Sequence, residues 1–173
     1  MKDNKCTNDI NIVLVEPEIP ENTGNIARTC AVTGAALHLI RPLGFEIDSR
    51  RLKRAGLDYW DKLDITIYDS LNEFLRIHGN DELWLYSSKG NHTHTSVKYS
   101  KGCYLVFGKE TAGLPENLLE AYQSSCIRIP MRNTLRCLNL SNAVAVGVYE
   151  VLRQFDFADL ECEGCPRTFL WEN

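Results

Sequence analysis

Short apolar runs that alternate with helical patterns are the feature that most restricts the fold of this chain. INIVLV from Ile10 is short, β-branched and closed by Pro17, as expected for a buried strand. Similar runs begin at Ala36, Asp64, Leu83, Cys103 and Cys126. We expect helices over about 21–34, 48–56, 70–79, 115–122 and 141–155. This alternation predicts an α/β fold, with a mostly parallel sheet and helices on both faces.

Several of the expected helix ends carry local signals. Asn22 or Thr23 can cap the first helix, and Gly34 suits a left-handed end. Proline in the first turn, at Pro115, fits a helix start. The segment from Asn139 to Ser141 is typical of a cap on the last helix.

Length and composition indicate one globular domain. The chain has 173 residues, of which 44% are apolar and 24% charged. We expect this domain over residues 1–155 and an irregular tail of unknown role over 156–173. No apolar run approaches the roughly 18–20 residues of a membrane span, and the polar N-terminus lacks the core of a signal peptide. These features predict a cytoplasmic protein without a membrane partner.

The seven cysteines do not form a disulfide or metal framework. Only Cys162 and Cys165 make a C-x-x-C pair, which supplies two ligands where a structural zinc ion needs four. We therefore expect reduced thiols and no bound metal.

The formal charge of −4 is no global signature of nucleic-acid binding, but the basic residues are clustered. Arginines and lysines crowd the segment 50–54, and a second group lies over 128–136. Such clusters often form only a solvated surface. A weakly acidic protein can also bind RNA through one local basic face.

The loop GKETAG, over 108–113, follows an expected strand and has a glycine at each end. It is not a Walker motif, because Leu114 and Pro115 stand where lysine and serine or threonine belong. No G-x-G-x-x-G follows any strand either. An ordinary strand-to-helix turn explains the loop, although Gly108 would also let a ligand approach the backbone, with the Glu110 carboxylate beside it.

Cys126 and Arg132 have the C-x5-R spacing of cysteine phosphatases. We discount that similarity, because IRIPM is an apolar strand that ends in proline and cannot form a phosphate cradle. The strand end instead faces the expected helix start at Asn139. Free backbone groups at such a junction can recognise an adenine edge.

Polar residues also recur within two expected helices. Asn22, Asn25 and Arg28 follow at three-residue steps and are expected on one helical face. They suit either a capped helix with a surface arginine or a site for an anionic group such as phosphate. Tyr149 lies in a helix of small and β-branched residues and would need a hydrogen-bond partner if buried.

Taken in order, these segments resemble the SPOUT superfamily of knotted methyltransferases. The similarity is close to the TrmL-type tRNA 2′-O-methyltransferases, which modify the wobble cytidine or uridine. It runs from about Ile10 to about Gln154. The matching blocks are VEPEIPENTGNIART, RAGLDYW, SSKG, LVFGKETAGLP, IRIPM and LNLSNAVAVGVYE.

The resemblance implies a C-terminal deep trefoil knot over about 83–155, a homodimer with shared active sites, and S-adenosylmethionine bound in the knot. Residues at cofactor positions are Tyr86, Gly108, Glu110, Ile129, Cys137 and Leu138. Residues at positions linked to activity are Asn25, Arg28, Ser141 and Tyr149. RNA contacts are expected from Arg28, Arg51, Arg54 and Arg132.

On this resemblance we expect a tRNA methyltransferase that acts on the ribose 2′-hydroxyl of the wobble nucleotide. Arginine side chains have a pKa above about 12 and are poor bases, so we assign Arg28 to phosphate binding and orientation. Tyr149, a substrate phosphate or a water molecule could accept the proton. The alternatives are the same reaction on another RNA, a non-catalytic RNA-binding protein, and an unrelated protein that binds adenine nucleotides.

Overall fold

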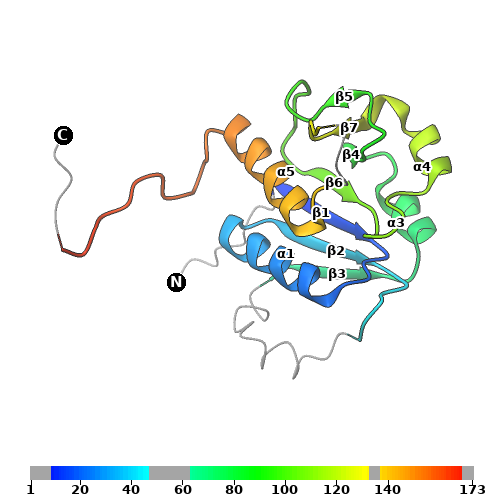
Figure 1. Ribbon diagram of the computed structural model, residues 1–173, viewed down its shortest axis with the longest axis horizontal. Helices are drawn as coiled ribbons and strands as arrows, with labels where there is room; N and C mark the ends of the chain where they lie inside the picture. Colours follow the sequence, from blue (N-terminus) through cyan, green and yellow to red (C-terminus); the bar gives the residue numbers. More distant parts are fainter. Residues whose placement is uncertain (1–8, 47–62, 133–136, 169–173) are drawn as a thin grey trace.

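A seven-stranded sheet forms the centre of the protein, as seen in a computed structural model that describes residues 9–46, 63–132 and 137–168 (Figure 1). Its strand order is β3-β2-β1-β6-β4-β7-β5, and every pair of neighbours is parallel. The predicted α/β class with a mostly parallel sheet is therefore confirmed. The strands are β1 Ile10–Val15, β2 Ala36–Ile40, β3 Ile65–Tyr68, β4 Leu83–Tyr86, β5 His92–Thr93, β6 Cys103–Phe107 and β7 Cys126–Arg128.

Helices cover both faces of the sheet, as predicted. Helices α1 (Pro20–Thr33) and α5 (Leu140–Gln154) lie together on one face, and α3 (Leu71–His78) and α4 (Glu116–Ala121) lie on the other (Figure 1). Alternate residues of β1 supply the two cores: Ile12 packs on the α1 and α5 side and Val13 on the α3 and α4 side. A short 3-10 helix, η2 (Gln123–Ser125), precedes β7.

The N-cap of helix α1 lies three to four residues before the cap that the sequence suggested. The prediction that Asn22 or Thr23 caps it is wrong, because the N-cap is Ile19 and Pro20 is the first helical residue. Both Asn22 and Thr23 are buried inside the helix. The predicted end is confirmed, since Gly34 has a φ of 75° and its N–H donates to the Cys30 carbonyl.

The far edge of the sheet departs from the prediction in length. The strand expected to run from Cys126 to Met131 ends at Arg128, and the two-residue strand β5 beside it was not predicted. Beyond β7, α5 packs back on β6, β1 and α1.

The knot stays a prediction, as do the domain limits. The helix expected over 48–56 lies outside the described residues. Residues 156–168 contain no helix or strand.

A chain of polar side chains, buried at Asn11, His38 and Tyr68 and exposed at Asp81, crosses the α3 side of the sheet. His38 Nδ1 lies 3.0 Å from the Tyr68 hydroxyl, and His38 Nε2 lies 3.2 Å from Asn11 Oδ1. Tyr68 also contacts His78 Nε2 at 3.0 Å, and His78 Nδ1 contacts Asp81 Oδ2 at 2.9 Å. Burial, assisted by the neighbouring His78, lowers the pKa of His38 to about 4. His38 is therefore neutral in the folded protein near neutral pH.

This low pKa predicts a pH-dependent stability. Between the ordinary histidine pKa of 6.5 and about 4, the unfolded chain binds a proton on His38 that the folded chain does not. The contribution of neutral His38 to the free energy of unfolding is therefore complete above pH 6.5. This contribution is lost as the pH falls toward 4. At about 1.4 kcal/mol per pKa unit the loss is about 3 kcal/mol.

Urea unfolding at pH 7.5 and pH 4 measures this effect against the variant His38→Gln. The wild type should lose about 3 kcal/mol more than the variant between the two pH values. Equal losses in both proteins would show that His38 does not carry this dependence.

Candidate functional site

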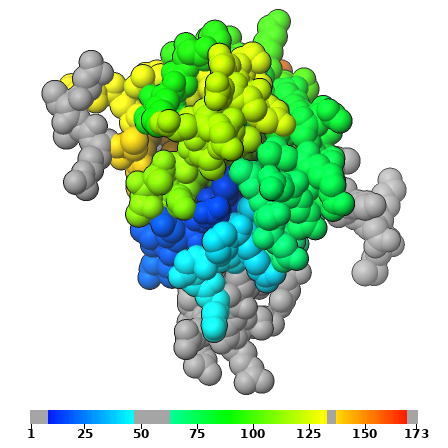
Figure 2. Space-filling model, turned by 90° about the vertical axis from the view of Figure 1, so that its right-hand side faces the viewer, coloured from blue at the N-terminus to red at the C-terminus, as the bar shows by residue number. Residues whose placement is uncertain are grey.

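The expected cofactor positions gather at the carboxyl ends of three neighbouring strands. Tyr86 ends β4, Gly108 follows β6 and Ile129 follows β7, and these strands are adjacent in the order β6-β4-β7. Cys137 and Leu138 lie just before α5. In open parallel sheets ligands bind at this edge. Figure 2 shows the side toward which the arrows of Figure 1 point, with the blue segment after β1 against the yellow-green segment after β6.

The Glu110 carboxylate joins the loop after β6 to the start of α1. It accepts hydrogen bonds from the backbone N–H of Glu18 at 2.9 Å, from that of Ile19 at 3.3 Å, and from the Asn22 side-chain amide at 2.8 Å. The helix dipole at the N-terminus of α1 favours a negative charge at this place. Glu110, predicted to contact the cofactor, therefore already has both oxygens engaged within the protein.

Asn22 extends this network to the start of α5. Its side-chain oxygen accepts a hydrogen bond from the Asn139 amide at 2.9 Å. The Asn139 oxygen in turn accepts from the Ser141 backbone N–H at 2.9 Å and from the Ser141 hydroxyl at 2.7 Å. The predicted cap at Asn139 is confirmed. One hydrogen-bonded series thus connects the starts of α1 and α5 with the loop after β6.

The loop 108–113 is held by further contacts. The Glu18 carboxylate accepts from Thr111 through its N–H at 3.1 Å and its hydroxyl at 3.0 Å. A Cβ on Gly108 would lie 2.1 Å from the Gly113 carbonyl carbon, so only glycine allows the loop to close this tightly. Gly113 has a φ of 71°, which glycine adopts without strain.

The three polar residues at three-residue steps on α1 do not form one common face. Asn22 is buried and turned toward Glu110 and Asn139, whereas Asn25 and Arg28 are exposed. The expectation of a shared face is corrected accordingly. Asn22 and Asn139 were not assigned to the site from the sequence, although both lie in the blocks that carry the resemblance. Asn139 had been interpreted as a helix cap, and Asn22 either as a cap or as part of a polar face with Asn25 and Arg28.

Tyr86 belongs to the core beneath α5. Its ring stacks on Phe107 with centroids 4.6 Å apart, and its hydroxyl lies 3.0 Å from that of Tyr99. A Cβ on Gly147 would come within 2.9 Å of the Tyr86 ring, which explains a glycine at this point of α5. Burial raises the pKa of Tyr86, so its phenol stays protonated. The Tyr86 side chain is therefore part of the core.

The other predicted residues that the structure describes are exposed or half-buried. Tyr149 is 49% exposed and therefore does not bury its hydroxyl. Arg132, Cys137 and Leu138 are exposed, Ile129 is half-buried, and the hydroxyl of half-buried Ser141 binds Asn139. Arg51 and Arg54 lie outside the described residues.

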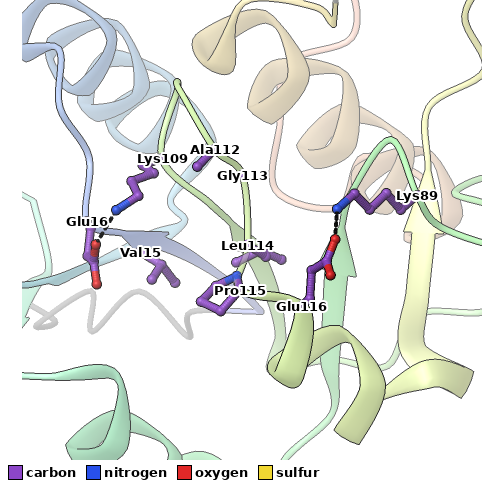
Figure 3. A pocket seen from close by; sticks show the side chains of 9 residues that line it. All are labelled: Val15, Glu16, Lys89, Lys109, Ala112, Gly113, Leu114, Pro115 and Glu116. Atoms are coloured by element: carbon purple, nitrogen blue, oxygen red, sulfur yellow. Dashed lines mark hydrogen bonds and ion pairs between the residues drawn. The ribbon is translucent and has the colours of Figure 1, made fainter.

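A hollow of about 330 Å³ lies beside the loop 108–113 (Figure 3). Its lining residues come from the ends of β1 and β6, from the loop after β4 and from the start of α4: Val15, Glu16, Lys89, Lys109, Ala112, Gly113, Leu114, Pro115 and Glu116. Two ion pairs face it, Glu16 with Lys109 and Lys89 with Glu116.

In the part of the chain that the structure describes, no three histidine, cysteine, aspartate or glutamate side chains are placed to hold a metal ion. Within the same ranges, no helix combines the length and apolar character needed to cross a membrane.

Comparisons with known proteins match nearly the whole chain. The model of the SpoU rRNA Methylase family matches residues 9–149. A curated relative from Listeria innocua is 54% identical over 152 residues, which make up 86% of this chain and 90% of that protein. The tRNA (cytidine(34)-2′-O)-methyltransferase of Escherichia coli is 49% identical over 149 residues, covering 86% and 95%.

Solved structures of methyltransferases are also similar to this chain. An RNA methyltransferase structure from Bacillus anthracis has a TM-score of 0.84 and 51% identity, covering 89% of this chain and 99% of that one. A structure described as giving insights into the 2-OH methylation of C/U34 on tRNA has a TM-score of 0.79 and 44% identity, covering 86% and 97%.

Removal of the Glu110 carboxylate should destabilise the protein. Glu110→Ala leaves the backbone N–H groups of Glu18 and Ile19 and the Asn22 amide without their acceptor. We expect a loss of about 1–2 kcal/mol in the free energy of unfolding, measured by urea denaturation.

Glu116→Ala is the matched control, because that carboxylate is 82% exposed at the start of α4. It should change the stability by less than about 0.5 kcal/mol. Equal effects of the two variants would contradict a structural role for the Glu110 network.

Proposed function

The chain belongs to the SpoU rRNA methylase family, and we propose that it transfers a methyl group from S-adenosylmethionine to the ribose 2′-hydroxyl of the wobble cytidine or uridine in tRNA. The similarity to wobble tRNA methyltransferases at about half identity over nearly the whole chain carries this proposal. It favours tRNA over ribosomal RNA as the substrate. Such a substrate would place the protein in the cytoplasm.

The residues at the strand ends suit a nucleoside cofactor. Gly108 and Ile129 offer backbone groups that can bind an adenine edge, and Leu138 presents an apolar side chain that is 41% exposed. Cys137 and the backbone of Tyr86 complete the set proposed to hold the cofactor. Glu110 contributes indirectly, because its hydrogen bonds fix the loop that begins at Gly108. When bound, S-adenosylmethionine supplies an electrophilic methyl group.

The residues of this chain must orient the ribose and handle one proton. Transfer of the methyl group from the sulfonium to the 2′-oxygen would release the hydroxyl proton, so these residues would have to hold the hydroxyl in line and provide for that proton. Arg28 is exposed on α1 and suits binding of a substrate phosphate. Tyr149, a substrate phosphate or a water molecule accepts the proton. Asn25 and Ser141 stay proposed as positioning residues, and exposed Arg132 as an RNA contact.

A homodimer would use the outer surface of α1 and α5. Val32, Val146 and Tyr149 are 60%, 40% and 49% exposed on these two adjacent helices. Exposed apolar side chains that gather on one face of the molecule favour a contact with another protein there. In such a dimer Tyr149 would lie at the interface, where it could reach the partner's active site.

Methylation of tRNA in vitro tests the proposed reaction. Wild-type protein, tRNA and S-adenosylmethionine should give a 2′-O-methylated nucleotide at the wobble position, located by nuclease digestion and mass spectrometry. Arg28→Ala should lower the rate by at least about 100-fold, because the nucleotide loses its orientation. Calorimetry with S-adenosylhomocysteine should show cofactor affinity like that of the wild type.

Arg76→Ala is the matched control, since Arg76 is exposed on α3, on the opposite face of the sheet. It should methylate tRNA at the wild-type rate. Full activity in Arg28→Ala would remove Arg28 from the proposed mechanism.

Sedimentation velocity tests the proposed dimer surface. A carboxylate at Val146→Glu would be buried in the contact, so this variant should sediment as a monomer where the wild type is a dimer. Ile77→Glu, at a residue 55% exposed on α3, should stay dimeric. A dimeric Val146→Glu would place the contact elsewhere.

A further inference from the structure

The hollow beside the loop 108–113 lies at the edge of the sheet proposed to hold the reaction, yet no role has been assigned to it. Val15 and Glu16 end β1, Lys109 follows Gly108, and Lys89 comes from the loop after β4. Its volume of about 330 Å³ is in the range of small-molecule sites, which begin at about 300 Å³. Apolar Val15, Ala112, Leu114 and Pro115 line it together with charged groups.

The two ion pairs at the hollow differ in their exposure to solvent. Lys109 Nζ lies 2.8 Å from Glu16 Oε2, and these side chains are 34% and 32% exposed. Lys89 and Glu116 are 59% and 82% exposed, so water screens their attraction strongly. In Figure 3 the first pair spans one side of the hollow and the second lies on the other. The hollow therefore has one ion pair partly shielded from solvent, Glu16–Lys109, and one ion pair exposed to solvent, Lys89–Glu116.

Glu16 is held in an uncommon backbone conformation. Its φ of 51° lies in the left-handed region, which non-glycine residues adopt at some cost. A hydrogen bond from its N–H to the Ile40 carbonyl, 2.9 Å long, fixes the backbone there. Such strain concentrates at sites that bind ligands. Here it accompanies a carboxylate directed toward Lys109 (Figure 3).

We propose that this hollow receives the pyrimidine base of the nucleotide to be methylated and that the Glu16–Lys109 pair recognises the edge of the base. This inference rests on the proposed function. The Glu16 carboxylate can accept a hydrogen bond from the amino group of cytosine, and the Lys109 ammonium can donate one to the carbonyl at the same position of uracil. Because one ion pair offers both an acceptor and a donor, it serves both bases.

The remaining lining residues complete this assignment. Exposed Ala112 and Pro115 suit contact with the face of a base, whereas Val15 and Leu114 are buried in the core. Lys89 can exchange its exposed partner Glu116 for a phosphate of the substrate, since the exposed pair contributes little. Lys89 therefore acts on the backbone of the RNA and does not distinguish the bases.

Methylation of two anticodon stem-loops that differ only in cytidine or uridine at the wobble position tests this assignment. Glu16→Leu removes the acceptor and should lower kcat/KM for the cytidine substrate about tenfold more than for the uridine substrate. Lys109→Met removes the donor and should give the opposite preference. Glu16→Gln keeps an acceptor oxygen and should restore much of the cytidine activity. Lys89→Met is the control and should lower both activities by the same factor.

The outcomes separate this inference from the function on which it rests. Equal losses for both substrates in Glu16→Leu and Lys109→Met would overturn base recognition and leave the methyltransferase activity in place. A loss of S-adenosylhomocysteine affinity in either variant, measured by calorimetry, would assign the hollow to the cofactor and also overturn it. Wild-type protein that methylates neither stem-loop would refute the proposed function, and base recognition with it.

Discussion

The Glu110 carboxylate is the contact on which the rest of the site depends. It brings the loop after β6 to the start of α1, across about ninety residues of sequence, through two backbone N–H groups and the Asn22 amide. The Asn22 side-chain oxygen in turn accepts a hydrogen bond from the Asn139 amide, at the start of α5. Three segments that share no local sequence pattern are thereby fixed relative to one another. The hydrogen bonds of a charged acceptor are stronger than neutral ones, which suits this role.

Two of the predicted cofactor residues, Glu110 and Tyr86, have structural roles in this arrangement. Side chains of Glu110, Asn22 and Asn139 hold the loops, and the buried Tyr86 ring supports α5 from below. Backbone groups near Gly108 and Ile129 are the ones we propose to recognise the nucleoside. A site built in this way depends on backbone placement more than on any one side chain. Loss of the network should therefore disturb binding and stability together.

Much of the fold could be predicted from the sequence, because strand and helix periods are local. The buried run from Ile10 and the helix end at Gly34 are examples. The predicted start of α1 was wrong, because the acceptor for the backbone N–H groups at that end is the Glu110 carboxylate, far along the chain. Neither Asn22 nor Thr23 supplies that acceptor. The two-residue β5 is too short to show any period.

The site was predictable only in part for the same physical reason. Sequence patterns identified the loop from Gly108 and the helix cap at Asn139, but not the direct contact between Asn22 and Asn139. Nor could they show that Glu16 has a left-handed backbone beside Lys109. Asn22 binds Glu110 of the loop 108–113 as well as Asn139, and Glu16 binds Lys109 of the same loop. This short loop therefore lies between the residues proposed to hold the cofactor and those proposed to bind the base. Glu110 and Lys109 are neighbours in this loop, so a shift of the loop would move the groups proposed to hold the cofactor and the groups proposed to recognise the base together.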